Sequence, residues 1–154
     1  MGILATGGNG QVWQPTTNAL ICTGDGISMA YRIGAPLMDM EMIQYHPTTL
    51  AENGFLITEG ARGEGAHLLN ADGERFMEKY APNKMELASR DVVSRAEQTE
   101  INEGRGFPDG TVALDITVVP RKRIHEALRE IVLVGRDFAG VDITKEPIHI
   151  KPGN

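Results

Sequence analysis

Cysteine, basic charge and long apolar runs are all scarce in this chain of 154 residues. Its single cysteine, Cys22, cannot form an intrachain disulfide, so the fold does not depend on an oxidising compartment. Apolar runs such as residues 131–134 are far too short to cross a bilayer. The chain also does not open with the charged and apolar regions of a secretion signal. These absences predict a globular chain with no membrane span of its own.

Basic residues are outnumbered by acidic ones, since 15 lysines and arginines face 21 aspartates and glutamates and give a formal net charge of −6. This balance argues against a general nucleic-acid binder, which carries a basic surface. It still allows a local basic pocket for a small anion.

Glycine is abundant, with 18 residues. They cluster in the first half of the chain, where tight turns or close backbone approaches are therefore expected.

Hydrophobic periodicity in the first half predicts short strands around one helix. A buried strand is expected over residues 2–8, where it runs into a glycine turn. The helix is expected over residues 26–33, with Asp25 capping its first turn. Two further strands are predicted over residues 39–45 and 55–58.

The second half is more helical in its pattern. The Asp-Gly turn within residues 68–77 predicts a hairpin. A strand is predicted over residues 111–116, a helix from Pro120 to the glycine at 140, and an extended tail over residues 147–150. One long amphipathic helix is expected over residues 87–103, and its apolar stripe consists of Ala88, Val92 and Ala96. Strand and helix do not alternate regularly, so the fold class is predicted to be α+β.

Three polar passages, at residues 43–49, 58–65 and 88–95, are the candidates for a functional site. Arginine suits a carboxylate ligand because its planar fork matches two oxygens. Glycines at 60, 63 and 65 let backbone amides approach a ligand. The side chains in these passages that can donate to an anion are His46, Thr58, Arg62 and Arg90. Two acidic residues, Glu59 and Glu64, lie between these donors in the sequence.

Each of these residues also has an ordinary structural interpretation. A histidine before a proline, such as His46, is common in turns. Glu59 and Arg62 are spaced for a local ion pair of small energetic value. Arg90 and Asp91 are typical of a solvated helix face. Spacing alone therefore predicts a small-anion site and nothing more specific.

A set of eight short motifs, in a fixed order along nearly the whole chain, carries a family resemblance. They are Ala5-Thr-Gly-Gly8, Thr16-Thr-Asn-Ala19, Thr23-Gly-Asp-Gly26, Gln44-Tyr-His-Pro-Thr48, Thr58-Glu-Gly-Ala-Arg-Gly-Glu-Gly65, Gly73-Glu-Arg-Phe-Met77, Tyr80-Ala-Pro-Asn83 and Arg90-Asp-Val-Val-Ser-Arg95. In these motifs the chain closely resembles the flavoprotein subunit of succinate dehydrogenases and fumarate reductases. The glycine motifs are weak singly, whereas the ordered set is strong.

The resemblance implies an architecture in which a mobile capping domain covers an FAD-binding domain, with a dicarboxylate bound between them. On this match residues 1–40 are a remnant of the FAD-binding domain, and residues 41–154 are the α+β capping domain. The family continues on both sides of this segment. We therefore expect an excised part of a larger subunit, which neither holds FAD tightly nor turns over fumarate by itself.

The resemblance also implies roles for individual residues, and no metal site. Those expected to contact or frame FAD are Ala5, Thr6, Gly7, Thr17, Asn18 and Asp25. Those expected at a substrate carboxylate are His46 and Thr58, with Glu59 beside them. Arg90 matches the arginine assigned as proton donor to fumarate, and Glu59 and Arg62 match its proton relay.

The expected partners are fumarate or succinate, the rest of the flavoprotein subunit and an iron–sulfur subunit, with no nucleic acid. The expected location is cytoplasmic, at the inner face of the membrane through partner subunits. L-Aspartate oxidases look similar and are the alternative within enzymes. A small-anion binding module without catalysis and a purely structural scaffold are the alternatives from other classes.

Overall fold

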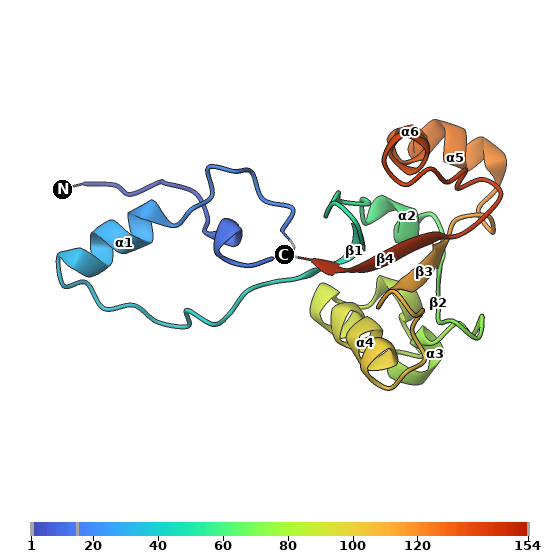
Figure 1. Cartoon of the computed structure of the whole chain (residues 1–154), viewed down its shortest axis with the longest axis horizontal. Coiled ribbons are helices and arrows are strands. Elements are labelled where there is room, and N and C mark those ends of the chain that lie inside the picture. Colours follow the sequence, from blue (N-terminus) through green and yellow to red (C-terminus); the bar gives the residue numbers. More distant parts are fainter. Residues whose placement is uncertain (1, 15, 154) are drawn as a thin grey trace.

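The computed structural model describes residues 2–14 and 16–153. A compact body of sheet and helices is joined to an elongated N-terminal arm, residues 2–45, which extends away from it (Figure 1). The arm contains η1 (Gly10–Val12) and α1 (Asp25–Arg32). The elements of the body are β1 (His46–Leu50), α2 (Gly60–Gly63), β2 (His67–Leu69), α3 (Met77–Tyr80), η2 (Met85–Leu87), α4 (Arg90–Asn102), β3 (Val112–Asp115), α5 (Arg121–Ala127), α6 (Arg129–Phe138) and β4 (Ile148–Gly153).

The body is built on one antiparallel sheet with the strand order β1-β4-β3-β2. In β4, Ile150 pairs with Leu50 of β1 on one side and with Val112 of β3 on the other. The segment predicted as a departing tail is thus an inner strand of the sheet. This expectation was wrong because the partners of β4 are distant in sequence, and a local pattern contains no sign of them.

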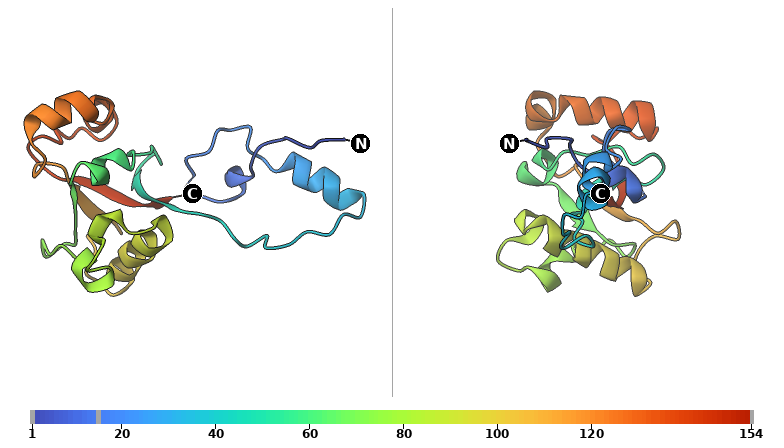
Figure 2. Two further views of the ribbon diagram at one scale, coloured as in Figure 1. Left: turned by 180° about the vertical axis from the view of Figure 1, so that it is seen from behind. Right: turned by 90° about the vertical axis from the view of Figure 1, so that its left-hand side faces the viewer.

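Helices lie on both sides of this sheet, with α5 and α6 in one group and α3 and α4 in the other (Figures 1 and 2). Apolar side chains from the strands and the helices form a single core. Among its fully buried members are Ile57, Leu68, Leu114, Ile116, Ile148 and Ile150. The mixed architecture with a small antiparallel sheet agrees with the predicted α+β class.

The helix predicted over residues 87–103 is confirmed as α4, and the left-handed Gly104 follows its end. Its buried face differs from the predicted stripe, since it consists of Val93, Ser94, Ala96, Glu97 and Glu100. Val92 is only partly buried, and Ala88 lies before the helix begins. The inner face therefore includes two glutamates, which a search for apolar residues passes over.

Several other expectations need correction. The strands predicted over residues 2–8 and 39–45 do not form, because no strand in the described part of the chain pairs with either segment. The turn within residues 68–77 is present, but its second arm continues into α3 and β2 pairs with β3 instead. The helix predicted from Pro120 is divided into α5 and α6 at Leu128, whose φ of −121° and ψ of 20° lie outside the helical range.

The arm confirms the helix predicted near residue 26, since α1 covers nearly the same span. Asp25 is its first residue and makes no capping bond, because Gly24 occupies the N-cap in the left-handed conformation. Many large apolar side chains of the arm are exposed, including Ile3, Ile21, Ile33 and Met38. Across residues 2–14 and 16–153, the search for a helix long and apolar enough to cross a membrane finds none.

Candidate functional site

The residues predicted to bind substrate and move protons come from separate elements that meet on the body. His46 begins β1, Arg62 lies in α2 with Glu59 at its N-cap, and Arg90 is the first residue of α4. In the sequence these positions span more than forty residues, so the fold and not the local pattern brings them together. Glu59 connects the side chains of Arg62 and Arg90, whose charges also act on His46, and we call these four residues the relay cluster: His46, Glu59, Arg62 and Arg90.

Glu59 is the centre of the relay cluster. Its Oε2 accepts hydrogen bonds from Nε and Nη2 of Arg90, both at 3.0 Å. Its Oε1 lies 3.4 Å from Nη2 of Arg62. The hydrogen bonds from Arg90 lower the pKa of the Glu59 carboxyl, with a further contribution from the charge of Arg62. Glu59 is therefore an ionised carboxylate that bridges two guanidinium groups.

Arg62 is the buried member, and none of its side chain is exposed. Nη1 donates a hydrogen bond of 2.5 Å to the main-chain oxygen of Glu86, which fixes the guanidinium against η2. The Glu86 carboxylate is itself held by Arg75 through bonds of 2.9 and 2.6 Å, and it accepts a bond from the Leu68 amide. Burial lowers the pKa of Arg62, although the charge of Glu59 opposes this change.

His46 is a neutral hydrogen-bond donor in this arrangement. Its Nδ1 accepts a bond of 3.2 Å from the Thr48 amide, so the ring proton belongs on Nε2. Burial lowers the pKa of His46 to about 4, and the positive charges of Arg90 and Arg62 lower it further in the same direction. The Nε2–H group is consequently available to an acceptor across the physiological pH range.

Thr58 is exposed next to Glu59, two residues before α2 begins. Its Oγ1 accepts a bond of 3.3 Å from the Gly60 amide, which leaves the hydroxyl proton free to be donated elsewhere. Gln44 is a further neighbour that residue-type reasoning did not single out, and its Oε1 lies 3.5 Å from Nη1 of Arg90. Its place in the Gln-Tyr-His-Pro motif was the only signal in the sequence.

The charges of the relay cluster favour an anion. Two arginines and one ionised carboxylate leave one net positive charge, and His46 adds a neutral donor beside it. The chain as a whole carries −6, so this local positive charge is contrary to the overall balance. A carboxylate ligand fits the guanidinium and imidazole donors chemically. Among the described residues, no group of three or more histidine, cysteine, aspartate or glutamate side chains is arranged to hold a metal ion.

The low pKa of His46 predicts a pH-dependent stability. The ordinary pKa of 6.5 falls to about 4 in the folded chain, so the unfolded chain takes up a proton first on acidification. The stabilising contribution is complete above pH 6.5 and is lost as the pH falls through 4. At 1.36 kcal/mol per pKa unit it amounts to about 3 kcal/mol.

Urea unfolding of the wild type and of His46→Gln between pH 4 and pH 7 measures this contribution. Groups distant from residue 46 titrate equally in both proteins, so the difference in unfolding free energy reports on the histidine and the charges beside it. We expect that difference to shrink as the pH is lowered. A difference that stays constant across the range would contradict a buried neutral His46.

The residues predicted to frame FAD lie together in the arm. A Cβ added to Gly26, in α1, would lie 1.8 Å from Oγ1 of Thr6, so the segment containing Ala5, Thr6 and Gly7 packs directly on this helix. A Cβ on Gly10 would lie 2.3 Å from Cγ of Asn18, which shows an equally close approach there. Ala5, Thr6, Gly7, Thr17 and Asp25 are exposed, and Asn18 is half-buried. Glycine at positions 10 and 26 therefore allows close packing within the arm, and Ala5, Thr6 and Gly7 stay open to solvent.

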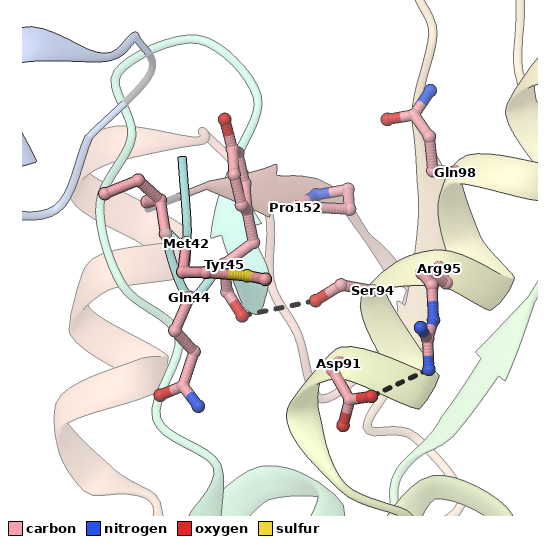
Figure 3. A pocket seen from close by; sticks show the side chains of 9 residues that line it. Met42, Gln44, Tyr45, Asp91, Ser94, Arg95, Gln98 and Pro152 are labelled. Carbon is pink, nitrogen blue, oxygen red and sulfur yellow. Dashed lines mark hydrogen bonds and ion pairs between the residues drawn. The ribbon is translucent and has the colours of Figure 1, made fainter. Parts of the chain in front are cut away.

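A cavity of about 630 Å³ separates the end of the arm from α4 (Figure 3). Met42, Tyr45 and Pro152 line one side of it, and Asp91, Ser94 and Arg95 of α4 line the other. Ser94 Oγ donates a bond of 3.3 Å to the Tyr45 carbonyl, and Arg95 pairs with Asp91 at 2.7 Å. No member of the relay cluster lines this cavity. The mostly apolar hollow therefore lies beside the charged site and is not part of it.

A family model described as "FAD binding domain" matches residues 2–154. The chain belongs to this family. The match runs without interruption from residue 2 to residue 154, so a model of an FAD-binding domain covers the relay cluster as well as the arm, where we expected a separate capping domain from residue 41.

Two named relatives confirm the resemblance to flavoprotein subunits. The succinate dehydrogenase flavoprotein subunit of Rickettsia bellii is 53% identical over 152 residues, which are 97% of this chain and 26% of that protein. The 8-methylmenaquinol:fumarate reductase flavoprotein subunit of Wolinella succinogenes is 49% identical over 154 residues, 97% of this chain and 25% of that protein. The chain thus spans about a quarter of the length of the relatives it matches.

A solved structure of E. coli quinol fumarate reductase supports the fold. It is 42% identical to this chain and superposes with a TM-score of 0.90, covering 97% of this chain and 28% of the other. This chain therefore adopts the fold of a fumarate reductase flavoprotein in the corresponding region.

Proposed function

We propose that this chain is the substrate-capping part of an FAD-dependent flavoprotein subunit that interconverts fumarate and succinate. Residues 41–154 would form the capping domain, and residues 1–40 would be a remnant of the FAD-binding domain. The observation that carries the proposal is the relay cluster, in which Arg90 Nε and Nη2 bond to Glu59 while Glu59 also pairs with Arg62. This cluster combines an anion site with a chain of proton-exchanging groups.

Substrate binding would use the donors at the mouth of the cluster. His46 Nε2–H and the Thr58 hydroxyl would donate to one carboxylate of the substrate. The neutral state of His46 suits this role because a carboxylate can then be bound without a change in protonation. The positive charge of Arg90, 42% exposed, would face the substrate and favour the negative charge that develops during reduction.

Reduction of a carbon–carbon double bond requires a hydride on one carbon and a proton on its neighbour. When bound, FAD supplies the hydride chemistry, which side chains cannot perform. The proton would come from the Arg90 guanidinium, at hydrogen-bond distance on the opposite face. Glu59, ionised at rest, would take up a proton from Arg62 and pass it to Arg90, and solvent would then restore the proton of Arg62. Succinate oxidation would use the same groups in the opposite direction.

Cofactor binding would involve the exposed backbone of the arm. The contacts proposed are with Ala5, Thr6, Gly7, Thr17, Asn18 and Asp25. Because five of these six residues are exposed, they would cover only part of a dinucleotide. We therefore propose that the isolated chain retains little FAD, and that the rest of the flavoprotein subunit provides most of the cofactor site. A subunit of this kind would pass electrons to an iron–sulfur partner and lie in the cytoplasm against the inner face of the membrane.

An activity comparison on the complete flavoprotein subunit tests the function. Purified subunit with FAD is assayed for fumarate reduction with an artificial donor, for succinate oxidation with an artificial acceptor, and for L-aspartate oxidation. We expect turnover with fumarate and succinate and none with aspartate. Turnover with aspartate alone would identify an L-aspartate oxidase instead. A small-anion binding module would bind fumarate, succinate and malonate in calorimetry with no turnover of any of them.

A further inference from the structure

Two buried ionisable side chains near the relay cluster have polar atoms without a hydrogen-bond partner. Glu97, on the inner face of α4, is fully buried, and neither Oε1 nor Oε2 has a partner. Arg62 is equally buried; its Nε and Nη2 donate no hydrogen bond, although Nη2 lies 3.4 Å from Glu59 Oε1 in an ion pair. Unsatisfied buried polar atoms are rare in native proteins and call for a specific explanation, such as an ordered water molecule.

The two groups act on each other across the interior. The positive charge of Arg62 lowers the pKa of Glu97, and the negative charge of an ionised Glu97 would raise that of Arg62. Burial has the larger effect on Glu97 and raises the pKa of its carboxyl well above the ordinary 4.5. A neutral carboxyl both donates and accepts hydrogen bonds, whereas the guanidinium only donates. A water molecule that accepts from Arg62 and donates to one Glu97 oxygen gives each group a hydrogen-bond partner.

Other titratable groups around α4 are engaged elsewhere. Glu86 of η2 is held by Arg75, and Tyr80 of α3 bonds to Glu100 together with Arg105. On β4, His149 pairs with Asp109. On β3, Asp115 is bonded to Thr117, and on β1 the Nδ1 of His46 is bonded to Thr48. Arg62 is therefore the charged group that acts on Glu97.

We propose that Glu97 is an uncharged carboxyl joined through buried water to Arg62, and that it positions the Arg62 guanidinium from the interior side. Arg62 is then held by the Glu86 carbonyl through Nη1, by Glu59 at the mouth of the site, and by the Glu97 water link behind it. Glu97 does not touch substrate and acts only through Arg62. Its role in the relay rests on the proposed function, whereas its protonation and its water link do not.

Carboxyl NMR titration of the full chain, with glutamate side chains labelled with ¹³C, tests the protonation state. Glu97→Gln assigns the Glu97 signal, and Glu100, whose pKa lies at about 2, is the internal reference. We expect Glu97 to titrate well above 4.5, and to titrate higher still in Arg62→Gln, because a positive charge is removed. Titration at or below 4.5 would overturn the proposal.

A crystal structure of the wild-type chain tests the water link, and it is decisive even if Arg62→Gln does not fold. We expect an ordered water within hydrogen-bond distance of both the Arg62 guanidinium and a Glu97 oxygen. A direct Arg62–Glu97 ion pair, or a dry gap between the two groups, would refute the link.

Turnover by the complete subunit tests the positioning role. Glu97→Met keeps the side-chain volume but removes the polar atoms, and we expect it to lower fumarate reduction roughly tenfold to 100-fold and to alter its pH profile. Glu97→Gln should restore most of this loss, because an amide can bond to the same water.

The exposed Glu146→Gln is the control and should leave turnover unchanged. Equal turnover in Glu97→Met and wild type would refute positioning. Inactivity of every protein, including wild type, would refute the proposed function and leave the titration and water results intact.

Discussion

Replacing Arg90 by glutamine is expected to lower fumarate reduction by the complete flavoprotein subunit about 10²–10⁴-fold, the range typical of a lost general acid. Glutamine has no comparable proton to give, and it cannot make the two bonds from Nε and Nη2 to Glu59. Arg90→Lys retains the charge but loses the planar fork, so it should also be strongly impaired. Steady-state kinetics with fumarate, at constant FAD content, measure both effects.

The matched control for Arg90 lies on the same helix. Arg95 is exposed and pairs only with Asp91 one turn away, so Arg95→Gln should leave turnover close to that of the wild type. Wild-type turnover in Arg90→Gln would rule out the proton-donor role and would favour the scaffold interpretation. Loss of FAD from the Arg90 variants, in contrast, would point to a folding defect, which the flavin absorbance of each preparation reveals.

Replacing Glu86 by alanine should destabilise the chain by about 2–4 kcal/mol, the second large effect that we expect. The Glu86 carboxylate is 3% exposed and satisfies the Leu68 amide and the Arg75 guanidinium together. Its removal leaves a buried amide without an acceptor. Arg75 is 35% exposed, so water can solvate its charge, and the cost is smaller than for a fully buried pair.

Urea unfolding at pH 7 measures the loss, with Glu126→Ala as the control. Glu126 belongs to an exposed i,i+4 pair with Lys122 at 4.0 Å, and its removal should change stability by less than about 0.5 kcal/mol. If Glu86→Ala lowered the free energy of unfolding no more than Glu126→Ala does, the Glu86–Arg75 pair would contribute no net stability. Arg62 should keep its bond to residue 86 in the variant, because that bond is made to the main chain.

Local patterns predicted those parts of the fold whose causes are local. The helices at α1 and α4 and the strand at β3 are confirmed, because hydrophobic patterning and glycine stops act within a few residues. The role of β4 could not be predicted in this way, since Lys151 pairs with Thr49, a residue near the other end of the body. The strands predicted in the arm did not form because nothing described in the chain pairs with them.

The functional site also has a part that the sequence predicted and a part that it did not. Residue types and motif order named His46, Glu59, Arg62 and Arg90, and the fold brings them together. The main-chain anchor at Glu86 was not predictable, because it depends on how η2 packs against α2. Glu97 was missed because it occupies an inward position of α4 where only apolar residues were sought. A charged residue in phase with the buried face was the signal that could have revealed it.

The place of β4 in the sheet has a consequence for the order of folding. Of the described strands, β1 is paired only with β4, and His46 stands opposite Gly153 at the end of that pairing. During synthesis, the ribosome must therefore add the last residues of this sequence before the strand that bears the histidine can gain its neighbour. The pairing closes a loop of about a hundred residues, which makes it a slow, late event in folding. Until then the strand that bears His46 would lack its β4 neighbour.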